Sequence, residues 1–359
     1  MEIYGMGTAV PEHYISQMDS AMIAKNCVDV PANHMRVFDE IYRRSGVKKR
    51  HSVILESSHG PLDERQSFYL GQEPSTSQRM SQYEAHAREL AISSAREALN
   101  FSGLEPSLIT HIVSVSCTGF CSPGFDIALI KELSLNSSVA RTHIGFMGCQ
   151  GAMNALRVAH GFVTADPNAV VLLCSTELCS IHQYAHWDAE KIVANALFAD
   201  GSASVVLGRS ENRNANRIRM IGSGSTLIEN TTEAMSWRIA DHGFEMTLSS
   251  AVPHLIANTI QPWMENWLSE FGLQRSSIRS WAVHPGGPRI LSAFADAMEI
   301  PKTSLDQSFE ILAQYGNMSS ATILFILKSM MELNPEPGFL VAVAFGPGLT
   351  VEAALFEIA

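Results

Sequence analysis

The sequence predicts an α/β protein in which buried strands alternate with amphipathic helices. Short runs rich in valine and isoleucine recur along the chain, and segments with a helical spacing of apolar residues lie between them. The chain has 359 residues, of which 46% are hydrophobic, so it can bury a large core. This length also allows two similar half-domains packed together.

Five segments are expected to form buried strands. Each is a short, nearly continuous apolar run, typical of a strand that is covered on both faces. They are residues 111–117 (HIVSVSC), 169–175 (AVVLLCS), 203–208 (ASVVLG), 281–284 (WAVH) and 339–346 (FLVAVAFG).

Three segments are expected to form helices. Apolar residues of 81–103 recur on one helical face, and Gly103 follows as a stop signal. A second helix should begin close to Cys149, and a third should follow Ser319 through residues 321–333. Residues 54–80 contain Gly, Pro, Ser and mixed charges, which indicates a long surface loop.

A division into two halves is suggested by similar endings along the chain. The sequence DGSASVVLG ends near residue 208 and GPGLTVEAALF near residue 356. We therefore predict an N-terminal half over residues 1–210 and a C-terminal half over residues 211–359.

The charge balance argues against nucleic acid or an anionic membrane as a main partner. The 25 basic residues face 36 acidic ones, giving a net charge of −11. We find no targeting signal and no apolar run long enough to cross a bilayer, so we expect a cytoplasmic protein. The six cysteines lack the spacing of metal ligands, so we expect no metal site and no disulfide framework.

Cys149 is the first candidate for chemistry. It follows a strand-like run in THIGFMGCQGAMNALRVA, at the expected start of a helix. Backbone N–H groups and the helix dipole at such a position stabilise a thiolate, and Gly148 and Gly151 would let a substrate carbonyl approach. A buried cysteine can also be a small core residue, so the interpretation depends on its neighbours.

His284 and Asn317 occupy junctions at which a polar side chain can point into a cleft. His284 ends a predicted strand in WAVHPGGP, and Asn317 precedes a predicted helix in QYGNMSSA. Taken singly, His284 could be a structural histidine and Asn317 a turn residue. With Cys149 they form a set suited to acyl transfer, in which a thiolate attacks and two neutral donors hold the developing oxyanion.

The motifs GCQGA, ALFADG, HPGGP, YGNMSSA and FGPGLTVE occur along the chain in this order. In order and approximate spacing they resemble those of the type III polyketide synthases, the family of chalcone synthase. The resemblance implies a thiolase-like fold of two similar half-domains in a layered αβαβα core, assembled as a homodimer through residues 118–123 and the nucleophile helix. It also implies that malonyl-CoA and an acyl-CoA starter are the substrates, with no metal or redox cofactor.

The resemblance also assigns roles to single residues. Cys149 is similar to the family nucleophile, and His284 and Asn317 to the pair that binds the thioester carbonyl and stabilises the enolate. His284 could hold Cys149 as a thiolate in an ion pair. The positions similar to gatekeeping and pocket residues are Phe198, Met246, Trp237, Cys179, Thr118, Ser122, Ser319 and Phe345.

Coenzyme A carries several phosphate charges, so its binding needs a local basic patch. The run RRSGVKKR over residues 43–50 is the densest basic segment. Arg44 aligns with a family cation, and Arg43 and Lys48 are alternatives. A solvated surface explains the run equally well.

Departures from the plant enzymes indicate a microbial type of pocket. Met246 replaces the second gatekeeping phenylalanine, Trp237 replaces a glycine, and Ser122 replaces a methionine that reaches across the dimer. Cys179 matches a pocket cysteine of bacterial naphthalenone-forming relatives. We expect an aliphatic acyl-CoA or malonyl-CoA starter, and a pyrone, resorcinol or phloroglucinol-type product.

Two other functions fit part of the sequence. An initiating β-ketoacyl carrier-protein synthase shares the fold and the Cys/His/Asn set, but it resembles this chain less closely around His284 and near residues 346–348. A catalytically inactive thiolase-like interaction subunit is the alternative of another class. It is disfavoured because all three reactive positions are present, and labelling with a thiol-directed acylating agent would test it.

Overall fold

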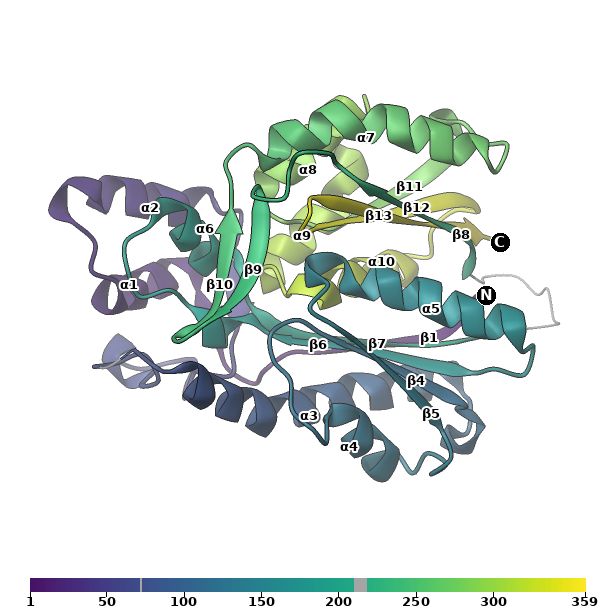
Figure 1. Cartoon of the computed structure of the whole chain (residues 1–359), viewed down its shortest axis with the longest axis horizontal. Helices are drawn as coiled ribbons and strands as arrows, with labels where there is room; N and C mark the ends of the chain where they lie inside the picture. The colour runs from purple at the N-terminus through teal and green to yellow at the C-terminus, as the bar shows by residue number, and fades with distance from the viewer. Residues whose placement is uncertain (72, 210–217) are drawn as a thin grey trace.

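The computed structural model describes residues 1–71, 73–209 and 218–359 as a layered α/β fold. Nine strands are hydrogen-bonded in the order β11-β12-β13-β8-β1-β7-β6-β4-β5. They lie in two sheet layers that meet where Glu2 of β1 pairs with Arg219 of β8 (Figure 1). The predicted boundary between residues 210 and 211 lies outside the described residues.

The lower sheet layer in Figure 1 comes from the N-terminal part of the chain. Strand β4 is parallel to β5 and β6, while β7 is antiparallel to both β6 and β1. Every residue of β6 and of β7 is buried, as expected for strands covered on both faces. The strands are β1 (Glu2–Ala9), β4 (His111–Ser116), β5 (Ala140–Gly145), β6 (Val171–Leu178) and β7 (Asp200–Gly208).

The upper sheet layer comes from the C-terminal part of the chain. Strand β11 is parallel to β12, and β13 is antiparallel to both β12 and β8. The strands are β8 (Ile218–Leu227), β11 (Ile278–Val283), β12 (Gly338–Gly346) and β13 (Thr350–Ile358).

Helices cover both sheets and fill the space between them (Figure 1). The central layer holds α5 (Gly151–Ala165) and α10 (Thr322–Glu332), and residues 322–327 of α10 are all buried. The outer layers are α3 (Thr76–Ser102) with α4 (Phe125–Glu132), and α7 (Val252–Ser269) with α8 (Pro288–Ala297). This αβαβα order is the predicted one.

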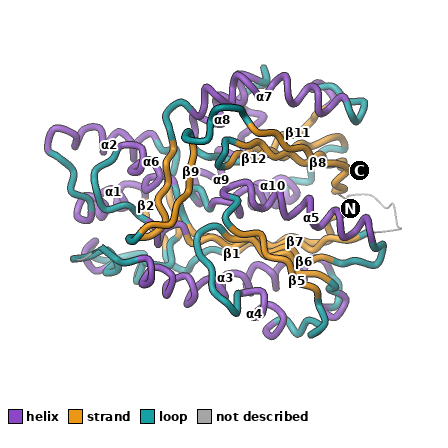
Figure 2. The backbone as a smooth tube through the Cα atoms, in the orientation of Figure 1, coloured by secondary structure: helices purple, strands orange, loops and turns teal. Residues whose placement is uncertain are grey.

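The remaining elements gather at one end of the layers (Figure 2). A two-stranded ribbon, β9 (Met235–Ala240) with β10 (Gly243–Leu248), lies beside α6. The others are β2 (Tyr14–Ser16), α1 (Gln17–Cys27), α2 (Met35–Arg44), β3 (Lys49–His51), α6 (Ala189–Leu197) and α9 (Asp306–Tyr315). No helix in the described ranges is long and apolar enough to cross a membrane.

The predicted loop over residues 54–80 is wrong in its last five residues, because α3 begins at Thr76. Ser75 caps this helix, and the Ser75 and Gln78 side chains satisfy free backbone N–H groups in a capping box. The predicted stop is confirmed, since Gly103 is left-handed with φ +65°.

Candidate active site

The backbone around Cys149 makes one tight turn between β5 and α5. Residues 148–150 form a single 3-10 turn, and α5 starts directly afterwards at Gly151. Gly148 has φ +79°, and a Cβ atom there would lie 2.4 Å from Cδ of Pro347. A glycine is therefore required beside the cysteine, both for its conformation and for the close approach of Pro347.

His284 and Asn317 are positioned by their own backbones. The His284 N–H donates to the carbonyl of Val343, at 2.8 Å, directly after β11 ends. The Asn317 N–H donates to the carbonyl of Leu197 at 2.8 Å, and the Asn317 carbonyl accepts from Ala199 at 2.9 Å. These two bonds bridge Asn317 to the segment that carries Phe198.

Cys149, His284 and Asn317 line one cavity, as the sequence analysis predicted. Cys149, Phe198 and Met246 line both this cavity and a neighbouring one. We call the two together the reaction cavity. Its further walls include the predicted pocket residues Phe345, Thr118, Cys179, Trp237 and Ser319.

His284 is the residue that most clearly indicates a binding function. Its side chain is 1% exposed, and both ring nitrogens are buried without a hydrogen-bond partner among the described residues. A buried polar group in this state costs about 1–3 kcal/mol. Such a cost is expected where a substrate supplies the partner.

Burial determines the charge states in this cavity. It raises the pKa of the Cys149 thiol to about 12, and hydrogen bonds from Ser319 and Asn317 oppose part of this rise. It lowers the pKa of His284 to about 3. Burial therefore favours the neutral form of both groups, and the thiolate held in an ion pair with His284 stays a prediction.

A buried carboxyl group stands behind the cavity wall. Glu177 of β6 accepts hydrogen bonds from the Thr118 hydroxyl at 2.7 Å and from the N–H of Cys117 at 3.0 Å. Burial raises the pKa of Glu177, although hydrogen bonds from Ser320, Thr118 and Cys117 oppose the rise. The sequence analysis missed Glu177, since nothing in STELCS distinguishes it from a surface glutamate.

A groove rimmed by arginines leads to the reaction cavity. Leu248 and Ile290 line both the groove and the cavity that holds His284. Arg43 and Arg44 are both ion-paired with Glu40, in agreement with their placement at a surface. The rim also contains Arg36 and Arg289, which the sequence analysis missed.

Two predicted site residues lie elsewhere. Lys48 is exposed and, among the described residues, is not part of the groove lining. Ser122 is exposed at the surface and does not line the reaction cavity of a single chain.

The two arginines that the sequence analysis missed differ in how they could have been found. Arg289 directly follows the HPGGP motif, which could have revealed it. Arg36 is recognisable only once α2 is placed in the structure.

The fold is the thiolase-like fold of type III polyketide synthase structures. Family models agree: residues 1–211 match "Chalcone and stilbene synthases, N-terminal domain", and residues 219–358 match the C-terminal domain of that family. The chain therefore belongs to the chalcone and stilbene synthase family. It is a type III polyketide synthase and so an acyltransferase.

Relatives and solved structures agree over nearly the whole chain. "Alpha-pyrone synthesis polyketide synthase-like Pks18" of Mycobacterium tuberculosis is 33% identical, over 99% of this chain and 91% of that protein. "1,3,6,8-tetrahydroxynaphthalene synthase" of Streptomyces peucetius is 30% identical, over 98% and 91%. The type III domain of Steely1 from Dictyostelium superposes with a TM-score of 0.91 at 27% identity, over 99% of both chains.

Proposed function

We propose that this enzyme condenses malonyl-CoA units onto an acyl-CoA starter by iterative decarboxylative Claisen chemistry. The observation that carries this proposal is the pair of buried, unpartnered ring nitrogens of His284 beside Cys149 and Asn317. A neutral imidazole and a neutral amide can donate hydrogen bonds to a thioester oxygen. Neither donor requires the burial of a charge, which would cost free energy.

Loading would begin with transfer of the thiol proton of Cys149 to His284. The sulfur attacks the starter thioester carbonyl, the bond from that carbonyl to the CoA sulfur breaks, and free CoA takes up the proton as it leaves. Because both groups are neutral before substrate enters, this proton moves during the reaction.

Extension would use the same two donors a second time. Malonyl-CoA loses CO2, and His284 and Asn317 hydrogen-bond to the oxygen of the enolate that remains. The enolate carbon attacks the acyl-cysteine, the carbon–sulfur bond to Cys149 breaks, and a β-ketoacyl-CoA is formed. Repetition lengthens the chain by two carbons each time.

The arginine rim would bind the phosphates of coenzyme A. Arg36 and Arg289 make no ion pair with another described residue, whereas Arg43 and Arg44 share Glu40. We therefore assign the main phosphate contacts to Arg36 and Arg289, with Arg43 and Arg44 in a lesser role.

Product and starter follow from the walls of the reaction cavity. The compact space beside Trp237 favours a short aliphatic or malonyl starter, and the name of Pks18 gives a pyrone as one product of a relative. We propose a pyrone, resorcinol or phloroglucinol-type product, with no metal or redox cofactor.

We also propose that the enzyme is a homodimer. Phe120, Phe146 and Met147 are exposed by 56%, 38% and 40% close to the nucleophile turn. Phe120 and Phe146 both contact Phe244, at 6.1 and 5.5 Å between ring centroids, so they form one apolar patch. A second copy would cover this patch, and light scattering that finds a fully active monomer at micromolar concentration would contradict it.

The test of the function is incubation of purified enzyme with malonyl-CoA and a panel of acyl-CoA starters. We expect CoA release, CO2 release and products whose masses increase by whole malonyl-derived units. Hydrolysis of the starter without any condensed product would overturn the proposal.

A further inference from the structure

The β9–β10 ribbon forms a small sheet of its own beside the reaction cavity. Its two strands are hydrogen-bonded to each other and are not among the nine strands of the large sheet. A two-stranded ribbon is only marginally stable by itself. Because Trp237 and Met246 of this ribbon line the reaction cavity, the contacts that hold the ribbon also determine where that wall lies.

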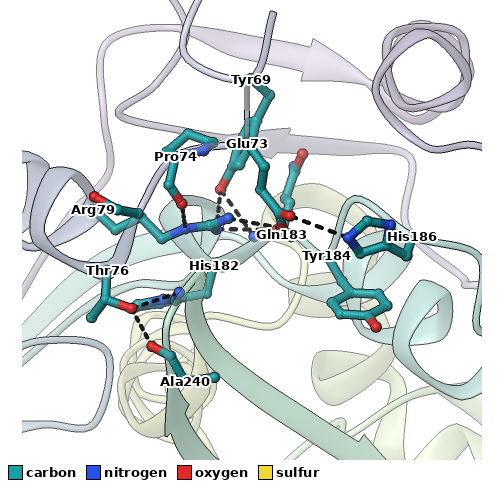
Figure 3. Close-up of polar contacts among 12 residues, drawn as sticks. Tyr69, Glu73, Pro74, Thr76, Arg79, His182, Gln183, Tyr184, His186 and Ala240 are labelled. Atoms are coloured by element: carbon teal, nitrogen blue, oxygen red, sulfur yellow. Dashed lines mark hydrogen bonds and ion pairs between the residues drawn. The ribbon is translucent and has the colours of Figure 1, made fainter. Parts of the chain in front are cut away.

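The N-terminus of α3 holds the turn of the ribbon through Thr76. The Ser75 side chain caps this helix, so the Thr76 hydroxyl is available for other bonds. It donates to the carbonyl of Ala240 (Figure 3) and accepts from the N–H of Gly243 at 2.8 Å. The N–H of Thr76 donates to the carbonyl of Asp241 at 2.8 Å. One residue therefore binds the ribbon turn through three hydrogen bonds.

Arg79 follows Thr76 on the same helix and is fully buried. Its guanidinium donates to the carbonyl of Pro74 at 2.9 Å (Figure 3). It also donates to the carbonyls of Ile181 at 2.7 Å and Gln183 at 3.1 Å. The planar guanidinium holds its donors in a fixed fork, unlike the rotatable ammonium of a lysine. Arg79 therefore fixes the backbone on both sides of residue 182.

The ribbon turn fits closely against Arg79. Gly243 has φ +101°, a backbone conformation that favours glycine, and a Cβ atom there would lie 2.8 Å from Cδ of Arg79. A larger residue at this position would push the ribbon and the arginine apart. The turn and the guanidinium are therefore matched in shape as well as linked through α3.

The buried charge of Arg79 has partners on several sides. The guanidinium lies 3.4 Å from the Glu73 carboxylate and donates to the Tyr69 hydroxyl at 3.0 Å. A buried charge without such partners would be strongly destabilising. An apolar side chain of similar size would need no partners, but it would leave the carbonyls of residues 181 and 183 without these donors. The contribution specific to Arg79 is therefore its hold on the backbone.

His182 connects this backbone segment to the cavity wall. Its Nδ1 accepts from the Phe244 N–H at 3.0 Å, so Nε2 carries the proton that it donates to the Thr118 carbonyl at 2.6 Å. The Trp237 ring packs edge-on against His182 and Phe244, with ring centroids 5.5 and 5.8 Å apart. A shift of this segment or of the ribbon turn would therefore displace the Trp237 ring.

The two proposed oxyanion donors are held by other contacts. The backbone of His284 is bonded to Val343, and that of Asn317 to Leu197 and Ala199. None of these bonds involves the ribbon. Loss of the contacts at the ribbon turn would therefore move one wall of the cavity and leave the donors for decarboxylation in place.

From these contacts we propose that Thr76 and Arg79 are positioning residues for the ribbon wall of the reaction cavity. Neither belongs to the cavity lining in the part of the chain that the structure describes. By fixing the ribbon they hold Trp237 and Met246 in one position, which restricts the starters and the product lengths that the cavity accepts. This inference rests on the proposed function.

The experiment removes the hydroxyl of Thr76 at nearly constant size. Thr76→Val deletes both side-chain bonds to the turn, and Thr76→Ser keeps the hydroxyl as the conservative variant. Thr164→Val is the control, because the Thr164 hydroxyl bonds to the carbonyl of His160 within α5. Arg79→Lys keeps the buried charge without the planar fork of donors, and it is the second variant in case Thr76→Val does not fold.

Products from malonyl-CoA with acetyl-CoA, and separately with hexanoyl-CoA, are quantified by mass beside CO2 release and thermal unfolding. In Thr76→Val we expect the ratio of the main product to products of other lengths to fall by a factor of about 2 to 13, the range that corresponds to one lost hydrogen bond. CO2 release should stay close to the wild-type rate. Arg79→Lys should shift the ratio in the same direction, while Thr76→Ser and Thr164→Val should keep it.

Unchanged product proportions in folded Thr76→Val, or in folded Arg79→Lys if the first variant does not fold, would overturn the inference. A parallel loss of all products and of CO2 release that follows a lower melting temperature would also overturn it, because the role of the residue would then be purely structural. A wild-type enzyme that makes no condensed product would instead refute the proposed function itself.

Discussion

The reaction cavity and the arginine groove differ in how much water surrounds their polar groups. His284 and Asn317 are each 1% exposed and held by backbone hydrogen bonds, whereas the Arg43 and Arg44 side chains are 68% and 74% exposed. An interaction in a dry, fixed site is much stronger than the same interaction at a wet surface. The comparison teaches that single changes should have large effects in the cavity and small effects at the groove.

Replacement of His284 should have the largest effect on both partial reactions. His284→Ala removes an oxyanion donor, which costs ~10²–10³ in rate, and it also removes the proton acceptor for Cys149. Asn317→Ala should reduce decarboxylation more than loading. Rates of CO2 release and of acyl-enzyme formation measure the two steps, and His254→Ala, an exposed histidine on α7, is the control.

If His284→Ala decarboxylated malonyl-CoA at the wild-type rate, a change in the reaction cavity would have no larger effect than a change at the arginine groove. His284 would then be a structural histidine, as its sequence alone allowed.

A change of Met246 in the wall of the reaction cavity should alter the product rather than abolish activity. Met246→Phe places a stiffer, bulkier side chain in the cavity wall that Met246 shares with Phe198 and Trp237. We therefore expect a different starter preference or a product that differs by at least one malonyl unit. Product masses across several starters measure this. Met18→Phe changes a methionine that is 67% exposed and should be silent. An identical product profile for Met246→Phe would remove Met246 from the path of the chain.

The pH dependence of Cys149 alkylation tests whether burial in the cavity keeps the thiol protonated. A thiol with a pKa of about 12 and an imidazole with a pKa of about 3 are both neutral between these values. The thiolate fraction therefore increases with pH, and the inactivation rate by iodoacetamide should rise steadily from pH 6 to pH 9, by up to about tenfold per pH unit. A plateau already present at pH 6 would instead indicate a preformed thiolate–imidazolium pair.

The smallest effects are expected at the groove. Arg36→Ala should raise the KM for malonyl-CoA by a factor of about 1.4 to 5, because an exposed charge contributes about 0.2–1 kcal/mol. The rise should shrink at high salt. Arg43→Ala should have a smaller effect, since Arg43 is tied to Glu40, and Arg238→Ala on the ribbon is the distant control. A hundredfold rise in the KM of Arg36→Ala for malonyl-CoA would mean that the groove excludes water as fully as the reaction cavity does.

The three residues proposed for catalysis could be recognised because each lies at a junction that is visible in the sequence. Cys149 precedes a helix, His284 follows a strand and Asn317 follows a glycine, and the structure brings all three to one cavity. These junctions and motifs are formed by residues that are neighbours in the chain, so they can be recognised without the tertiary structure.

What could not be predicted depends on tertiary contacts. The raised pKa of Cys149 comes from burial by elements that are distant in sequence. Arg36 and Arg289 are far apart in the chain and meet only because α2 and the start of α8 border one groove. The early start of α3 is different, because the Ser75 and Gln78 capping box was present in the sequence and was overlooked.

The most direct test of the central claim is the separation of decarboxylation from condensation in Cys149→Ala. Condensation requires a covalent acyl-enzyme, whereas decarboxylation requires only the donors His284 and Asn317. The measurement is CO2 release from malonyl-CoA beside acyl-enzyme formation by intact mass, for Cys149→Ala and wild type. We predict that Cys149→Ala forms no acyl-enzyme and no polyketide but still converts malonyl-CoA to acetyl-CoA. Polyketide formation by Cys149→Ala, or loss of its decarboxylation while the protein remains folded, would contradict the account.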